Sequence, residues 1–239
     1  ESKEKLQNYL EKWLHLLIKI ELSDLVNLSN SKSKNNYERA LCFQLFENNG
    51  IIKRESVNEI IKNISKEDRA NLRKTGVKIG RYHIFLPKML KPNAVNLRIN
   101  LWKVYFQENK ETTIPQFGLN FLQNQTKLSK KFLLICGFEN FDKFYVRVDI
   151  LERLFLKIIE NTKDRKFNID SDMINLLGCS KENFFKLLEL MQYKRKKTNE
   201  SNKEFFSYQP KYETNKQRKI VKKTNKKGPF NKLSELRFR

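Results

Sequence analysis

The chain has 239 residues, of which 39% are hydrophobic, and a formal net charge of +22 at pH 7. Seven glycines and five prolines are too few for the many tight turns of a β-sandwich or barrel, so a mainly α-helical protein is expected. The excess of Lys and Arg would attract a polyanion, above all nucleic acid. Lys outnumbers Arg 36 to 13, and a compositional bias of this kind raises the charge without any binding role. The distribution of charge along the chain is therefore the better test.

The residues that build metal and catalytic sites are scarce. Three cysteines (Cys42, Cys136 and Cys179) lie far apart, and the two histidines are His15 and His83. No Cys/His cluster with zinc-ligand spacing occurs, and no glycine-rich phosphate loop or acidic magnesium box is found. We therefore expect no catalytic residue, no metal site and no cofactor in this chain.

The sequence also bears on location. The longest apolar stretch, Leu14–Ile20, is interrupted by His15 and Lys19 and is too short to span a bilayer, so no membrane partner is expected. An odd and sparse cysteine count is typical of a reducing compartment, so a cytoplasmic location is expected. Because the chain begins with Glu1 and not with Met, we expect it to be a piece of a longer protein.

The apolar periodicity predicts the elements in chain order. Ser65 followed by Asp68 is a capping-box pattern that begins a helix, and Gly76 is expected to end that helix in a left-handed conformation. Asp149 and Glu152 are expected to cap a later helix. The predicted helices cover residues 3–28, 37–47, a stretch after Ser56, 65–75, 93–106, a stretch after Asp149, 170–177 and 181–192, and the strand-like segments are 77–86 and 143–148.

These elements suggest three regions. Residues 1–110 would form a helical domain, and residues 111–192 a smaller α-rich subdomain. Residues 193–239 would form a basic, disordered tail, because residues 191–239 hold sixteen Lys and Arg against four Glu. The tail ends in a short amphipathic motif of Phe230, Leu233 and Leu236. The expected fold class is thus mainly α with a few short strands or extended segments and a disordered basic tail.

Residues 69–107 are the most informative segment, because they contain nine Lys and Arg and no Asp or Glu. Compositional bias adds lysines, but it does not by itself remove acids from so long a run. Aromatic and imidazole rings lie among the cations, as in proteins that stack on unpaired bases. The candidate nucleic-acid-binding residues are Arg69, Arg73, Lys74, Lys78, Arg81, Tyr82, His83, Lys88, Lys91 and Arg98.

Two other features leave alternatives open. The helices on either side of Gly178 have the outline of a helix-turn-helix, so a DNA-binding regulator using residues 170–192 is one alternative. The second predicted helix balances Lys181 and Lys186 with Glu182 and Glu189, which favours plain helix packing. The terminal motif of the tail is compatible with a non-enzymatic scaffold that docks a partner.

Three motifs between residues 39 and 106 carry a family resemblance. They are RALCFQLFENNGIIKRESV (39–57), RANLRKTGVKIGRYHIFLPKMLKP (69–92) and Leu101-Trp102. Together they resemble the region that follows the motor in alphaproteobacterial DExH-box RNA helicases. Those helicases are similar to the RNA helicase of the mitochondrial degradosome. The resemblance covers residues 37–106 strongly and the remainder loosely.

The resemblance implies an accessory helical region that packs on two RecA-like domains and grips single-stranded RNA as it leaves them. The implied partners are single-stranded RNA, the helicase's own motor domains upstream, and a degradosome nuclease or the ribosome. ATP and magnesium would be bound by the missing motor, since none of the family's ATP-binding residues has a counterpart here. Any enzymatic activity would therefore belong to the parent helicase.

Overall fold

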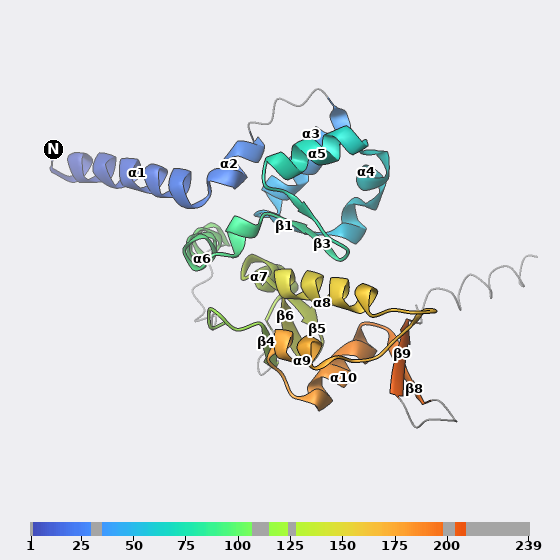
Figure 1. Cartoon of the computed structure of the whole chain (residues 1–239). Helices are drawn as coiled ribbons and strands as arrows, with labels where there is room; N and C mark the ends of the chain where they lie inside the picture. Colours follow the sequence, from blue (N-terminus) through green and yellow to red (C-terminus); the bar gives the residue numbers. More distant parts are fainter. Residues whose placement is uncertain (1, 30–34, 107–114, 124–127, 198–203, 209–239) are drawn as a thin grey trace, which may run out of the picture. The chain divides into compact units, whose positions relative to one another are not determined.

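The computed structural model describes residues 2–29, 35–106, 115–123, 128–197 and 204–208 (Figure 1). These residues are mainly helical with short antiparallel strands, which confirms the predicted fold class. The chain divides into two compact units. The first contains residues 1–161 and 170–187, and the second contains residues 162–169 and the chain from Leu188 onward.

The first half of the first unit surrounds a three-stranded sheet in the order β1-β3-β2. Its elements are α1 (Ser2–Glu21), α2 (Ser23–Ser29), α3 (Asn36–Glu47), β1 (Ile51–Lys53), η1 (Arg54–Val57), α4 (Asn58–Asn63), α5 (Lys66–Lys74), β2 (Lys78–Ile79), β3 (His83–Phe85), η2 (Pro87–Leu90) and α6 (Pro92–Phe106). The single helix predicted for residues 3–28 is two helices, because the chain turns at Leu22 to bring Leu25 and Leu28 into the core. Leucines and isoleucines from α2, α3, α4, α5 and β3 fill that core.

The predicted ends of α5 are confirmed. The Ser65 side chain accepts a hydrogen bond from the backbone N–H of Asp68, and the Asp68 side chain accepts one from the backbone N–H of Ser65. Gly76 has φ +89°, a conformation that glycine adopts without steric strain. The chain therefore leaves α5 at a fixed angle and enters β2 directly.

The second half of the first unit contains another three-stranded sheet, in the order β4-β6-β5. The elements are β4 (Phe121–Gln123), α7 (Lys130–Ile135), β5 (Phe138–Phe141), β6 (Phe144–Arg147), α8 (Val148–Glu160), α9 (Ser171–Leu177) and α10 (Lys181–Leu190). The predicted cap of α8 is wrong. Asp149 pairs with Arg147, and Glu152 accepts hydrogen bonds from the loop between β2 and β3.

Helix α6 joins the two halves, so the predicted division at residue 110 does not separate compact units. Ala94 and Leu97 pack in the core around the first sheet. Val95 and Ile99, on another face of the same helix, pack against Phe132 and its neighbours in the second core. A helix buried on two faces cannot lie at a domain edge, because separating the halves would expose one of them to water.

The second unit contains a three-stranded sheet in the order β7-β9-β8. Its strands are β7 (Lys166–Phe167), β9 (Glu204–Tyr208) and β8 (Tyr193–Lys197). The prediction of a disordered tail over residues 193–239 is therefore wrong for residues 193–197 and 204–208, which form strands. A search for helical periodicity misses strands, whose side chains repeat every two residues. The remainder of the predicted tail, including Phe230, Leu233 and Leu236, lies outside the described residues.

None of the helices in the described part of the chain has the length and apolar character needed to cross a membrane.

Candidate nucleic-acid interface

Most of the predicted contact residues in the basic segment have exposed side chains. They lie on the C-terminal turn of α5, on β2, in the β2–β3 turn, on η2 and directly before α6. The exposed cations are Arg73, Lys74, Lys78, Arg81, Lys88 and Lys91. The structure thus brings the Arg73–Arg81 part of the segment to the surface within two neighbouring elements and the turn after them.

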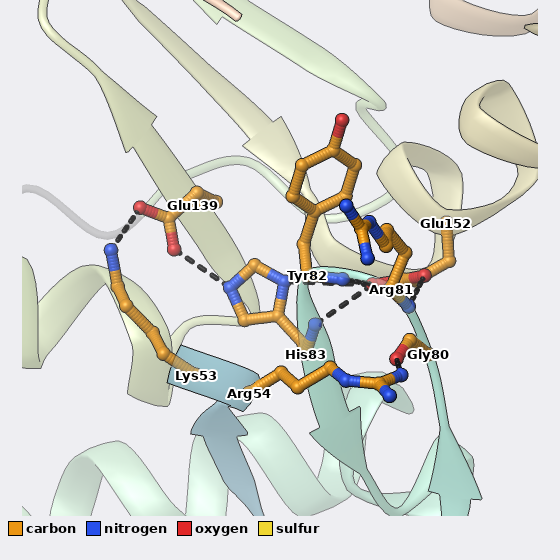
Figure 2. A network of polar contacts seen from close by, with 8 residues as sticks. All are labelled: Lys53, Arg54, Gly80, Arg81, Tyr82, His83, Glu139 and Glu152. Carbon is orange, nitrogen blue, oxygen red and sulfur yellow. Dashed lines mark hydrogen bonds and ion pairs between the residues drawn. The ribbon is translucent and has the colours of Figure 1, made fainter. Parts of the chain in front are cut away.

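The β2–β3 turn is held by a carboxylate from α8, as Figure 2 shows. Oε2 of Glu152 accepts a hydrogen bond from the backbone N–H of Arg81 at 2.6 Å. Oε1 accepts from the backbone N–H groups of Tyr82 and His83, both at 2.8 Å. Glu152 is only 4% exposed, so these three bonds form in a water-poor environment where hydrogen bonds to a charged acceptor are strong.

The turn requires glycine at position 80 because the Glu152 carboxylate occupies the place of a side chain there. A Cβ atom built there would lie 2.3 Å from Cδ of Glu152 and 2.4 Å from its Oε2. Only a residue without a side chain lets the carboxylate approach the three N–H groups. Arg54 also holds the turn: its guanidinium donates to the carbonyl oxygen of Gly80 at 2.7 Å (Figure 2). The backbone N–H of Arg54 donates to the carbonyl oxygen of Tyr82 at 2.9 Å. The turn is thus fixed through its backbone.

Fixing the backbone leaves the two side chains of the turn available at its surface. The guanidinium of Arg81 lies 5.7 Å from the centre of the Phe155 ring, within the range of a cation–π contact. The half-buried Tyr82 ring packs edge-on against the same phenylalanine, with centroids 5.4 Å apart. Arg81 therefore has a preferred direction before any ligand arrives.

His83 cannot stack on a base, which corrects the sequence prediction. Its side chain is buried, with 1% of the residue exposed, and Nε2 lies 2.7 Å from Oε2 of Glu139. Lys53 donates to the other oxygen of Glu139 at 2.5 Å (Figure 2). Burial alone would raise the pKa of Glu139, but the hydrogen bonds from His83 and Lys53 outweigh it and hold that pKa below its ordinary value of 4.5. This cluster joins β1 and β3 to β5 and is structural.

The prediction that Arg98 contacts nucleic acid is also wrong, because Arg98 is 1% exposed and cannot reach a phosphate. Its guanidinium donates to the backbone carbonyl oxygens of Asn49, at 2.8 Å, and Met89. Burial lowers the pKa of Arg98 to about 10, so the group still carries its charge at neutral pH. The residue serves the fold by satisfying carbonyls at the turn before β1 and in η2.

Two further candidate residues, Arg69 and Lys88, already bind other groups of the protein. Arg69 is half-buried, and its guanidinium donates to the carbonyl oxygen of Ile61 at 2.8 Å. Lys88 forms an ion pair with Asp24 at 2.7 Å, although 58% of its side chain remains exposed. Five of the predicted residues have exposed side chains that form no ion pair with a carboxylate of the described residues. They are Arg73, Lys74, Lys78, Arg81 and Lys91.

The helices on either side of Gly178 are present, with Gly178 in the left-handed conformation at φ 68°. The exposed charges of α10 are Lys181, Glu182, Lys186 and Glu189. Two positive and two negative side chains do not form the basic face that a groove-reading helix needs. No observation here favours the DNA-regulator alternative.

The described residues contain no group of three His, Cys, Asp or Glu side chains placed to hold a metal ion. Burial raises the pKa of Cys136 to about 12 and that of Cys179 to about 11, so both thiols are protonated at neutral pH.

No protein-family model, curated protein or solved structure matches this chain. The likeness to RNA helicases therefore rests on the motifs of residues 37–106 alone.

Sequence reasoning missed the residues that anchor the turn. Arg54 and Lys53 lie before the acid-free segment, and Glu139 and Glu152 lie far after it. One signal was present. A glycine beside strand residues often marks a close approach of another group to the backbone, and Gly80 precedes Arg81 in that setting. The approaching group itself could not be read from the sequence.

Proposed function

We propose that this chain is an RNA-binding accessory region of an ATP-dependent RNA helicase and that it grips single-stranded RNA. The RNA backbone would lie along Arg73, Lys74, Lys78 and Arg81, with Lys88 and Lys91 as outlying contacts. Tyr82 would supply an aromatic ring beside Arg81. The helicase context comes from the resemblance of residues 37–106, and the binding role comes from the surface itself.

The observation that carries the binding role is the anchored turn beneath Arg81. Three backbone N–H groups bound to a buried carboxylate fix the turn, so Arg81 loses little conformational freedom on meeting a phosphate. The neighbouring cations Arg73, Lys74 and Lys78 come from a segment without acids, so no carboxylate within it competes for them.

No motif of the sequence and no acidic cluster of the described residues supports binding of ATP or magnesium by this chain. The sequence has no G-x-x-x-x-G-K-[ST] loop, and the described residues hold no acidic metal cluster. The proposal therefore assigns ATP hydrolysis to other domains of the parent helicase and assigns only RNA contact to this chain.

The binding role is tested by fluorescence anisotropy with a labelled single-stranded oligouridine at salt concentrations from about 50 to 200 mM. We expect the logarithm of the binding constant to fall with log salt by roughly 0.7 for each phosphate contacted. Arg73→Glu with Arg81→Glu should weaken binding and flatten that slope. Lys130→Glu with Lys131→Glu is the matched control, because both lysines are exposed on α7 outside the segment. Equal loss in both double variants would show that net charge, and not this surface, governs binding.

The helicase context needs a separate test. The direct test is to read the coding sequence immediately upstream of the codon for Glu1. In-frame motifs of a RecA-like motor would support the proposal, and a start codon at that point would contradict it.

A further inference from the structure

The second unit contains a sheet whose two faces differ in chemistry. Lys194 pairs with Ser207, and Lys196 pairs with Phe205 across β8 and β9. Lys166 on β7 pairs with Ser207 from the other side. Because directly paired residues in an antiparallel sheet project to the same side, these five side chains share one face. We call it the lysine face: Lys166, Lys194, Lys196, Phe205 and Ser207.

The opposite face is the packed one. The rings of Phe167, Tyr193 and Phe206 are buried there, and Phe167 contacts both of the others at centroid distances of 5.3 and 5.8 Å. Arg195 and Glu204 form an ion pair on this side. Glu204 is the sole acid within the three strands, so alternation places that carboxylate away from the lysine face.

The lysine face combines exposed cations with an accessible ring. Lys166, Lys194 and Lys196 are exposed, and Phe205 is half-buried. Nζ of Lys166 lies 4.9 Å from the centre of the Phe205 ring, and Lys196 stands directly opposite that ring in the register. Lys194 and Lys196 are two residues apart along one strand, about 6.6 Å. The spacing is of the same order as that of successive phosphates in an extended nucleic-acid strand.

One polar atom on this face lacks a partner. Oγ of Ser207 is buried and makes no hydrogen bond among the described residues. In the register Ser207 lies between Lys166 and Lys194, so this small residue separates the two lysines, and its buried Oγ is not a contact for a ligand. The described residues of the three strands contribute no carboxylate to this face, and three lysines gathered there repel one another unless an anion screens them.

We propose that the lysine face is a second binding site, which takes single-stranded nucleic acid. An unpaired base stacks on Phe205, and the backbone phosphates on either side of it contact Lys166, Lys194 and Lys196. Binding of this kind tolerates many sequences, because every base offers a face for stacking. The site does not depend on the Arg73–Arg81 surface, which lies in the other unit.

A competing explanation for the lysines is protection of an edge. β8 is an edge strand, and lysines there hinder pairing with another chain. That role requires neither an accessible Phe205 ring nor any affinity for nucleic acid. Substitution of Phe205 therefore separates the two explanations.

The test uses the full chain, both wild type and with Arg73→Glu and Arg81→Glu, so that either site can fail alone. Phe205→Leu keeps an apolar side chain but removes the ring, and we expect it to weaken binding to oligouridine by about tenfold. Tyr208→Leu is the matched control, because Tyr208 is an exposed aromatic on the same strand that projects to the opposite face. An equal effect of the two substitutions, or none at Phe205, would overturn the proposal.

Charge and position are tested separately. Lys194→Gln with Lys196→Gln should reduce the magnitude of the salt slope by about 1.4, which is two contacts of roughly 0.7 each. Lys181→Gln with Lys186→Gln on α10 carries the same charge change away from the strands, and an equal reduction there would refute the site. Photo-cross-linking with 5-iodouridine oligonucleotides should join the base to Phe205, and cross-links only elsewhere would contradict stacking.

Three ligands define what the face accepts. Equal affinity for oligouridine and oligothymidine would assign recognition to phosphates and bases, and a preference for oligouridine would add a contact to the ribose hydroxyl. Duplex RNA should bind more weakly than either single strand, because its bases are paired. Equal binding of the duplex would overturn the proposal.

Discussion

The anchor of the β2–β3 turn can be tested by one isosteric substitution, Glu152→Gln. The change keeps the volume of the side chain but replaces one carboxylate oxygen with an NH2 group. If the amide oxygen takes the place of Oε1, it still accepts from the N–H groups of Tyr82 and His83. The NH2 group then faces the N–H of Arg81, which Oε2 accepts at 2.6 Å in the wild type. Two donors cannot bond to each other, so this N–H loses its partner.

The magnitude follows from these contacts. A buried donor without an acceptor costs about 1–3 kcal/mol, and each of the two remaining bonds loses about 1 kcal/mol when its acceptor becomes neutral. Glu152→Gln should therefore lower the free energy of unfolding by about 3–5 kcal/mol, a large part of the roughly 5–15 kcal/mol of a typical protein. Turning the amide the other way would leave two donors unpaired and cost more.

The assay is urea denaturation followed by far-ultraviolet circular dichroism. Glu160→Gln is the control, because Glu160 is an exposed glutamate at the end of the same helix, where a change of about 0.5 kcal/mol or less is expected. A loss below about 1 kcal/mol for Glu152→Gln would refute the idea that this carboxylate anchors the turn.

Two further predictions concern the buried charges. The pKa of Glu139 lies below 4.5, so the stability that its charge provides is complete above that pH and is lost as the pH falls through the lowered value. Urea denaturation should accordingly find Glu139→Gln less stable than wild type by a constant amount above about pH 5, with a gap that narrows in stronger acid; a widening gap would contradict this sign. Arg98→Lys should lower the free energy of unfolding by about 1–3 kcal/mol, because a single ammonium nitrogen cannot take the positions of the three guanidinium nitrogens that donate to the carbonyls of Ala94, Asn49 and Met89. Its RNA affinity should equal that of wild type in anisotropy measurements, and reduced binding by the folded variant would restore Arg98 as a contact.

Local patterns predicted much of the fold. Ser65 and Asp68 correctly predict the start of α5, and Gly76 correctly predicts its end, because a cap depends on residues within one turn of the helix. The strand-like character of residues 77–86 was also correct, since β2 and β3 lie within it. Each of these features is determined by neighbours a few positions away, which a single sequence displays directly.

Features that depend on distant partners could not be predicted in the same way. The sequence predicts that Glu152 caps a helix because it follows Asp149 at capping distance, yet its partners are 69–71 residues earlier in the chain. Arg98 looked like a surface cation because nothing in its own helix shows that Asn49 and Met89 present carbonyl oxygens to it. Both errors involve a charged group whose burial is balanced by backbone groups, and backbone groups leave no trace in the sequence.

The corrected surface limits how strongly the basic segment can depend on salt. Arg98 is buried, Arg69 is bound to a carbonyl and Lys88 is paired with Asp24. The exposed cations outside such contacts are Arg73, Lys74, Lys78, Arg81 and Lys91. At roughly 0.7 for each phosphate, five cations account for a slope of about −3.5. A steeper slope requires cations from elsewhere in the chain. If the lysine face supplies them, neutralising Lys166, Lys194 and Lys196 together should return the slope to about −3.5, because three contacts at roughly 0.7 each account for about 2.1.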